Sequence, residues 1–195
     1  MRLKKVVFLD RDGTINVDRG YVYRREEWEW IPGAVDALKQ LVVAGFKLAV
    51  VSNQSGIGHG LYTVSDVRAL HTFMQQELAA QGIVLAAVVF CPHQRGRGCR
   101  CRKPAVGMAR QAERLLGAVD YAASWAVGDK VADAEFGKNL GTHTALIRGA
   151  YWQEATLLEK PDLVVGSLHE AAHGIVSWQR KTITERMMAP SQRID

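Results

Sequence analysis

Six short apolar runs recur along the chain, and most of them lack the alternation of polar and apolar residues that marks a half-exposed strand. They lie at residues 6–9, 48–51, 88–90, 126–127, 145–147 and 163–165. Apolar runs of this length predict strands of a parallel sheet, because such strands are covered by helices on both faces. We therefore expect these segments to form the centre of the fold.

Helical patterns fill the stretches between these runs. The clearest one spans residues 67–78, with apolar side chains three and four positions apart. It opens with Thr63 and Asp66, which are spaced as a capping box, and it closes at Gly82. The alternation of strand and helix predicts an α/β fold with a doubly wound parallel sheet, in which ligands bind beyond the carboxyl ends of the strands.

The chain has 195 residues, of which 48% are hydrophobic, and this is enough for one well-buried core. We expect a single domain over residues 1–178. Residues 179–195 read as a polar, basic tail whose last dozen residues are frayed or loosely docked.

The first apolar run ends at Asp10, Arg11, Asp12 and Gly13. In an extended chain residues i and i+2 share a face, so Asp10 and Asp12 are expected to point the same way, with room for a divalent cation between them. Mutual repulsion lets one carboxylate stay ionised while the other holds a proton. Taken alone, the pair also fits a solvated junction between a strand and a turn.

Polar residues suited to phosphate chemistry follow other predicted strands. The second strand is followed by Ser52, Asn53, Gln54 and Ser55, whose hydroxyl, amide and backbone N–H groups can hold phosphate oxygens. Further along come Lys103, which supplies a fixed positive charge, and the late acidic pair Asp129 and Asp133.

These four parts, in this order, resemble the motifs of the haloacid-dehalogenase-like phosphatases over residues 6–147. The resemblance implies that Asp10 is the nucleophile, that Asp12 is the general acid and then the general base, and that Ser52 and Lys103 hold the transferring phosphoryl group. It also implies a Mg²⁺ ion bound by Asp10, the backbone carbonyl of Asp12 and Asp129, with Asp133 orienting its water ligands.

All three cysteines of the chain fall in the segment 91–101, beside a histidine. Cys91, His93, Cys99 and Cys101 form the pattern C-x-H-x5-C-x-C, which is typical of a closed, structural Zn²⁺ site. The alternative is that they are buried free thiols, although the glycines and arginines around them supply no core for thiols to join. Clustered thiols favour a reducing cytoplasm over a disulfide framework.

The net charge of +5 favours anionic partners, which include nucleic acids, membrane surfaces and small phosphorylated molecules. The arginines of segment 91–102 resemble an RNA-binding tract, but no aromatic residues lie among them, so we regard nucleic acid as the weaker alternative. No apolar stretch is long enough for a signal segment or a membrane span. We expect a cytoplasmic monomer that does not associate with membranes.

Within the resembling family, the zinc pattern before Lys103 is similar to two groups without a large cap domain, the heptose-1,7-bisphosphate 7-phosphatases and the histidinol-phosphate phosphatases. The loop Asp18, Arg19, Gly20 and Tyr21 is similar to a sugar-contacting loop of the heptose enzymes. This resemblance implies that Lys130, Arg102 and residues 18–21 bind the second phosphate and the hydroxyls, with the C7 phosphate at Asp10. The short spacer between His93 and Cys99 favours the histidinol-phosphate group instead, and His59 also departs from the heptose pattern. We expect the heptose activity and keep the histidinol-phosphate activity as the alternative.

Overall fold

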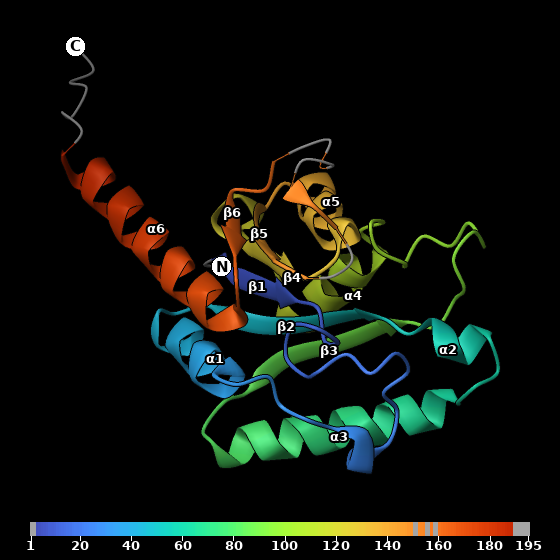
Figure 1. The fold of residues 1–195 in the computed structure, drawn as a ribbon. Coiled ribbons are helices and arrows are strands. Elements are labelled where there is room, and N and C mark those ends of the chain that lie inside the picture. The colour runs from blue at the N-terminus through green and yellow to red at the C-terminus, as the bar shows by residue number, and fades with distance from the viewer. Residues whose placement is uncertain (1–2, 150–151, 155–156, 158–159, 189–195) are drawn as a thin grey trace.

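The computed structural model describes residues 3–149, 152–154, 157 and 160–188 (Figure 1). Six strands form one parallel sheet in the order β3-β2-β1-β4-β5-β6. The strands are β1 (Val6–Leu9), β2 (Lys47–Asn53), β3 (Leu85–Cys91), β4 (Trp125–Gly128), β5 (His143–Ile147) and β6 (Leu163–Val165). Each of the six apolar runs lies in one of these strands, as predicted.

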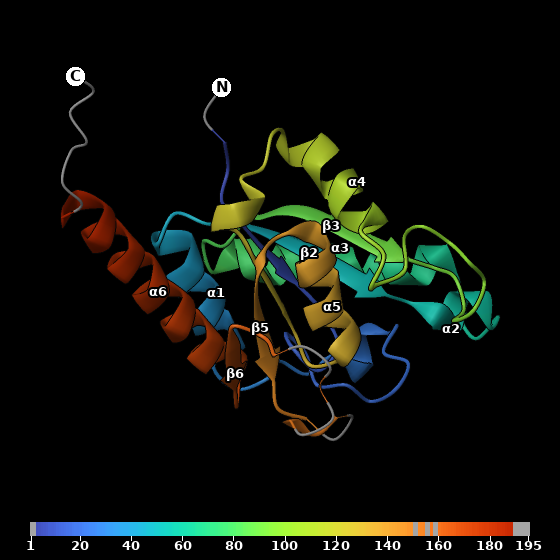
Figure 2. The same cartoon turned by 90° about the horizontal axis from the view of Figure 1, so that it is seen from above.

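Helices cover both faces of the sheet, so the doubly wound α/β fold is confirmed (Figures 1 and 2). On one face lie α1 (Ala34–Val43), α3 (Val64–Ala80) and α6 (Leu168–Met188), and on the other lie α4 (Gly107–Leu116) and α5 (Val131–Leu140). The short helix α2 (Ser55–Gly58) follows β2, and two 3₁₀ turns, η1 (Arg25–Glu27) and η2 (Tyr121–Ala123), lie in connecting segments.

The central strand β1 is buried along its whole length because helices cover both of its faces. Val7 and Leu9 belong to the core beneath α1, α3 and α6, whereas Val6 and Phe8 belong to the core beneath α4 and α5. A strand whose alternate side chains enter two cores has no polar face, which explains the unbroken apolar run.

The topology places the functional edge of the sheet. The chain passes from β1 to β2 and β3 on one side, and then returns to form β4 on the other side of β1. The connections that follow β1 and β4 run in opposite directions, toward β2 and β5, which opens a crevice beyond the carboxyl ends of β1 and β4. Among the described residues, segments 10–33 and 92–106 beside this crevice contain loops, one 3₁₀ turn and two isolated β-bridges at Asn16.

Helix α6 continues past residue 178, where the sequence analysis placed the start of a tail. Residues 179–188 extend this helix, and its end projects beyond the sheet (Figures 1 and 2). Residues 189–195, the rest of the predicted tail, lie outside the described residues. No described helix combines the length and apolar character needed to cross a bilayer.

Candidate active site

A cavity of about 1060 Å³ opens at the carboxyl ends of β1, β2 and β4. The residues predicted to act in catalysis or to bind substrate line it, with the exception of Arg19. Those lining it are Asp10, Asp12, Asp18, Gly20, Tyr21, Ser52, Asn53, Gln54, Ser55, Arg102, Lys103 and Lys130. Residues from distant parts of the chain therefore meet at one edge of the sheet.

Asp10 and Lys103 form a buried ion pair at the base of the cavity. Lys103 Nζ lies 2.8 Å from Asp10 Oδ1 and 2.6 Å from Asp133 Oδ1. Burial acts to raise the pKa of Asp10, but the ammonium groups of Lys103 and Lys130 outweigh it and hold that pKa below its ordinary value. Asp10 is therefore an ionised carboxylate that faces the cavity, as a nucleophile must be.

Asp10, Asp129 and Asp133 form a buried acidic group in which one oxygen of each lies within 4.8 Å of the others. Asp129 Oδ1 is buried and accepts no hydrogen bond from the described residues. Burial, with the nearby carboxylates, raises the pKa of Asp129 to about 7. Clustered carboxylate oxygens with an unused acceptor are the donor set that a hard cation such as Mg²⁺ prefers, so these residues fit that ion.

Gly13 makes the close approach of Asp129 possible. A Cβ atom at Gly13 would lie 2.3 Å from Asp129 Oδ2, and the φ angle of Gly13 is +81°. Both facts require glycine at the turn that follows β1.

The carboxylate of Asp12 is held apart from this acidic group. Asn16 Nδ2 donates to its Oδ1 at 3.0 Å, Gln54 Nε2 donates to its Oδ2 at 2.8 Å, and the Arg11 guanidinium contacts both oxygens. The sequence predicted room for a cation between the side chains of Asp10 and Asp12. In the structure, the carboxylates that gather with Asp10 are instead those of Asp129 and Asp133.

Two amides of the predicted phosphate loop are engaged with the protein. Asn53 Oδ1 accepts the backbone N–H of Lys103 at 3.0 Å, and its Nδ2 donates to the carbonyl oxygen of Lys103. Gln54 Nε2 donates to Ser52 Oγ at 2.7 Å as well as to Asp12. In this arrangement the two amides position Lys103, Ser52 and Asp12.

The loop 18–21 meets the cavity through Asp18. Lys130 Nζ lies 3.0 Å from Asp18 Oδ2 and 3.6 Å from Asp129 Oδ1, and Gly20 N–H donates to Asp18 Oδ1. Arg19 points away from the cavity and pairs with Glu29 at the surface. Because side chains alternate along an extended loop, only part of this segment can face the substrate.

The predicted zinc ligands converge. Sγ of Cys91 lies 3.7 Å from Sγ of Cys99 and 3.2 Å from Sγ of Cys101, and Nδ1 of His93 lies 3.5 Å and 3.2 Å from Cys91 and Cys101. Tetrahedral Zn²⁺ with bonds of about 2.3 Å to sulfur requires sulfur atoms roughly 3.8 Å apart. The four groups fit that ion, and all three cysteines are free of disulfides.

The segment 92–102 also forms one wall of the cavity. Arg95, Arg97 and Arg102 line it, and Arg102 Nη1 donates to the carbonyl oxygen of His93 at 3.2 Å. The positive φ angles of Gly96 and Gly98 let the loop turn between these arginines. These arginines therefore place positive charge along this wall of the cavity, as expected for an anionic substrate.

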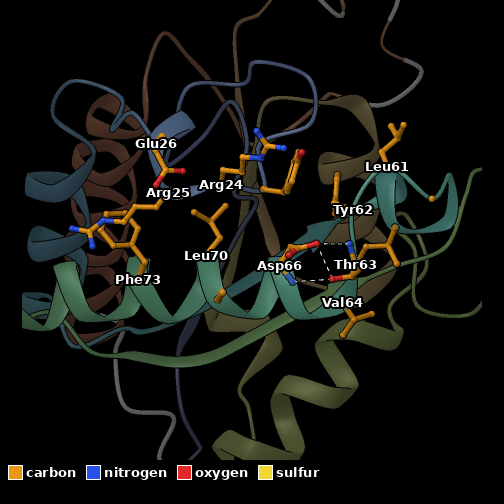
Figure 3. A pocket seen from close by; sticks show the side chains of 14 residues that line it. Arg24, Arg25, Glu26, Leu61, Tyr62, Thr63, Val64, Asp66, Leu70 and Phe73 are labelled. Atoms are coloured by element: carbon orange, nitrogen blue, oxygen red, sulfur yellow. Dashed lines mark hydrogen bonds between the residues drawn. The ribbon is translucent and has the colours of Figure 1, made fainter.

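A second hollow of about 1000 Å³ lies between residues 23–26 and helix α3 (Figure 3). Tyr62 lines both hollows, and its hydroxyl donates to Gln54 Oε1 at 2.9 Å. Burial raises the pKa of Tyr62 to about 12, so the hydroxyl keeps its proton at neutral pH. Asp10 and Asp133 of the acidic group line the first cavity and not this one, so the hollow in Figure 3 is a neighbour of the candidate active site.

Sequence reasoning missed three residues that support the site, namely Arg11, His71 and Tyr62. Arg11 is fully buried, and its Nη1 lies 3.2 Å from His71 Nε2. A signal was present for His71, because it lies on the apolar face of the helix predicted at residues 67–78. Nothing in the pattern around Arg11 or Tyr62 distinguished them from surface residues.

Comparison with known proteins finds a HAD-like hydrolase profile and similar sequences that are named phosphatases. The profile of the HAD-hydrolase-like family matches residues 100–171. The chain is 41% identical over 152 residues to the D-glycero-beta-D-manno-heptose-1,7-bisphosphate 7-phosphatase of Yersinia pestis, a match that covers 73% of this chain and 80% of that protein. It is also 41% identical to the enzyme of the same name from Haemophilus ducreyi, over 85% of this chain and 94% of that one.

Solved structures agree with the sequence matches. The D,D-heptose 1,7-bisphosphate phosphatase of B. bronchiseptica, solved with magnesium and phosphate, is similar to this chain with a TM-score of 0.78 and 32% identity. The similarity covers 89% of this chain and 99% of that one.

Proposed function

Because the chain belongs to the D-glycero-beta-D-manno-heptose-1,7-bisphosphate 7-phosphatases of the HAD-like hydrolases, we propose that it hydrolyses the C7 phosphate of D-glycero-D-manno-heptose 1,7-bisphosphate. The observation that carries this proposal is the ionised Asp10, which is paired with Lys103 in a cavity that arginine and lysine side chains also line. A nucleophile placed there suits a phosphate monoester.

In the first step, a carboxylate oxygen of Asp10 attacks phosphorus, and the bond between phosphorus and the sugar oxygen breaks. Asp12 gives its proton to that departing oxygen, so the sugar leaves as an alcohol and Asp10 carries the phosphoryl group. Lys103 and Ser52 stabilise the charge on the oxygens of the transferring group.

In the second step, Asp12 is a carboxylate and takes a proton from water. The water oxygen attacks phosphorus, the bond to Asp10 breaks, and inorganic phosphate leaves. Asp12 ends the cycle protonated and Asp10 ionised, so the two steps together consume one water molecule.

Magnesium fits the acidic group described above. Asp10, Asp129 and the backbone carbonyl of Asp12 would hold the ion, and Asp133 would orient its water ligands. When bound, the ion neutralises negative charge on the phosphate and on the surrounding carboxylates. The similar structure solved with magnesium and phosphate supports this choice of metal.

We assign a structural role to Zn²⁺ at Cys91, His93, Cys99 and Cys101. Four protein ligands leave no position for water, so the ion would fold the loop and supply no chemistry. The loop ends directly before Arg102 and Lys103, and ordering it would fix the two cations that face the substrate.

The second phosphate of the substrate would bind at the rim of the cavity. Arg102 and Lys130 line this region, and the loop from Asp18 to Tyr21 would contact the sugar hydroxyls. Contacts between cations and phosphate oxygens give both affinity and orientation. The arrangement therefore suits a sugar that carries two phosphates.

We further propose that the chain forms one catalytic domain, which includes the whole of α6 and not only residues 1–178, and that it acts as a monomer in the cytoplasm without membrane contact. Three free thiols gathered at a metal site suit a reducing compartment. Gel filtration of the purified protein tests the proposed monomer.

A substrate panel tests the proposed function. Purified protein with Mg²⁺ is offered heptose 1,7-bisphosphate, histidinol phosphate and a 3′-phosphorylated oligonucleotide, and phosphate release is measured. We expect the highest kcat/KM with the bisphosphate, and a ³¹P NMR spectrum of the product that retains only the anomeric phosphate. Faster turnover of histidinol phosphate, or loss of the anomeric phosphate, would contradict the proposal.

A further inference from the structure

Arg11 is a charged side chain with no exposed surface. Its relative exposure is 0%, and it lies between the two carboxylates that lead the motif. A guanidinium can be buried only if acceptors surround it, because an unpaired buried charge is strongly unfavourable. The identity of those acceptors therefore indicates what the residue does.

The first acceptor is its own neighbour in the chain. Arg11 Nε lies 3.1 Å from both carboxylate oxygens of Asp12, and Nη2 lies 3.0 Å from Asp12 Oδ1. Adjacent residues of an extended chain point in opposite directions, so this contact requires the turn that follows β1. A planar guanidinium that contacts both oxygens fixes the orientation of the carboxyl group.

The other two acceptors, His71 and the backbone of Val22, contact the terminal nitrogens of the Arg11 guanidinium. His71 Nε2 lies 3.2 Å from Arg11 Nη1, and the carbonyl oxygen of Val22 accepts from Nη2 at 2.5 Å. Burial, with the charge of Arg11, lowers the pKa of His71 to about 3, so the ring is neutral at pH 7 and can accept a hydrogen bond. The guanidinium is thereby fixed by His71 on helix α3 and by Val22, which follows the loop 18–21.

We propose that Arg11 is a positioning residue that directs the Asp12 carboxyl group toward the leaving oxygen and links its orientation to the loop 18–22. This inference rests on the proposed function, in which Asp12 donates a proton to that oxygen. Arg11 itself touches no substrate, because its surface is fully covered by protein. Asn16 and Gln54 complete the set of donors that holds the carboxylate.

The proposed role of Arg11 predicts different effects on two kinds of substrate, alkyl phosphates and aryl phosphates. An alkyl phosphate releases a poor leaving group that needs a proton, whereas p-nitrophenyl phosphate releases a phenolate that does not. The parameter kcat/KM reports the steps up to release of the leaving group. Misplacing Asp12 should therefore lower kcat/KM for the alkyl substrate far more than for the aryl one.

The experiment compares Arg11→Met with Asp12→Asn, the double variant and Arg110→Met, an exposed arginine outside the cavity. We expect Arg11→Met to lower kcat/KM about 10²-fold for the heptose bisphosphate and less than about fivefold for p-nitrophenyl phosphate, within the range known for general acids. The double variant should be no slower than Asp12→Asn, because both changes remove the same function. Arg110→Met should leave both values unchanged.

Equal losses on the two substrates, or additive losses in the double variant, would overturn the proposal, because a merely structural residue acts on both substrates alike. If Arg11→Met does not fold, Arg11→Lys decides the question. Lysine keeps the charge but lacks the planar fork, so the same selective loss is expected, and an unselective one overturns the proposal. If the wild-type protein does not turn over the heptose bisphosphate, the proposed function fails, and any alkyl phosphate that it hydrolyses still tests Arg11.

Discussion

Lys103 Nζ lies 2.8 Å from Asp10 Oδ1, and both side chains are almost completely buried. The same ammonium contacts Asp133, so one cation separates two carboxylates. Without it, the two acids would repel each other and one would retain a proton. The ion pair therefore keeps Asp10, the proposed nucleophile, ionised.

We predict that Lys103→Met lowers kcat by about 10²–10³-fold, the range expected when one group that stabilises the transition state is lost. The acid limb of the pH profile should also move to higher pH, because the pKa of Asp10 is no longer held down by Lys103. Steady-state kinetics between pH 5 and 8 measure both effects. Lys138→Met, on the exposed side of α5, is the matched control, and an unchanged profile in Lys103→Met would contradict this role for the lysine.

The sequence was sufficient to predict which residues come together at one cavity, because the strands of a parallel sheet end at the same edge. Asp10 follows β1, Ser52 lies near the carboxyl end of β2, Lys103 comes after β3 and Asp129 follows β4, and the alternation of strand and helix brings these ends together. The convergence of the four predicted zinc ligands could also be predicted, because they lie within one eleven-residue segment and need little tertiary information to meet.

Side-chain directions could not be predicted in the same way. Asn53 and Gln54 have the groups that bind phosphate, yet they hydrogen-bond to protein atoms that arrive from other elements. Arg19 lies in the predicted substrate loop but pairs with Glu29. Arg11 is charged but buried, and one of its partners, His71, is contributed by the distant helix α3. These contacts depend on distances between elements, which a pattern along one chain does not contain.

Binding of Mg²⁺ should depend on pH through Asp129, whose pKa is about 7 in the metal-free protein. Below that pH the carboxyl group holds a proton that the metal must displace, so the affinity should rise about tenfold per pH unit up to about pH 7 and then level off. Calorimetric titration in buffers of different ionisation enthalpy detects the released proton. Asp129→Asn should bind Mg²⁺ more weakly and should lose the dependence of this affinity on pH. Release of a proton when Mg²⁺ binds to that variant would assign the pH dependence to another group.

The same raised pKa has a consequence for folding. The folded metal-free protein retains a proton on Asp129 that the unfolded chain loses near pH 4, so its stability should fall as the pH rises from about 4 to about 7. Adding Mg²⁺ should remove this penalty, because the ion binds only the folded protein's site. Urea unfolding with and without Mg²⁺ at pH 5 and pH 7.5 measures the difference.

Acid should destabilise the protein through His71. Its pKa is about 3 when folded and near 6.5 when unfolded, so below pH 6.5 the unfolded chain takes up a proton that the folded protein does not. The contribution of His71 should therefore fall by up to about 1.4 kcal/mol per pH unit between pH 6.5 and 3. Urea unfolding of His71→Gln should show a shallower decline than the wild type, with the exposed His169→Gln as the control. Identical slopes in His71→Gln and the wild type would contradict the assignment.

Replacing Cys99 or Cys101 by serine should release zinc, because a hydroxyl is a poor substitute for a thiolate ligand. Hydrogen bonds from the Arg102 backbone and from Cys101 outweigh partial burial and lower the pKa of Cys99 to about 7, so a thiolate is available at neutral pH. Elemental analysis measures the zinc content, and thermal unfolding measures the loss of stability that follows when the loop before Lys103 loses its zinc. Arg97→Ala changes the same loop without touching a ligand and should keep its zinc. Normal zinc in either serine variant would argue against ligation.

Lys130 lies between the loop 18–21 and the acidic group, with its ammonium 3.0 Å from Asp18 Oδ2 and 3.6 Å from Asp129 Oδ1. A cation placed there can bind the phosphate that is not hydrolysed, and contacts to a part of the substrate that does not react affect binding more than the chemical step. Lys130→Ala should therefore raise KM for the heptose bisphosphate by about tenfold or more and change KM for a sugar monophosphate much less, with Lys138→Ala as the control. Burial opposes the charge of Lys130, but Asp10, Asp129 and Asp18 raise its pKa well above the ordinary value, so the ammonium persists throughout the working pH range. Equal increases in KM for both substrates would mean that Lys130 acts on Asp18 and Asp129 alone, and would remove it from the second-phosphate site.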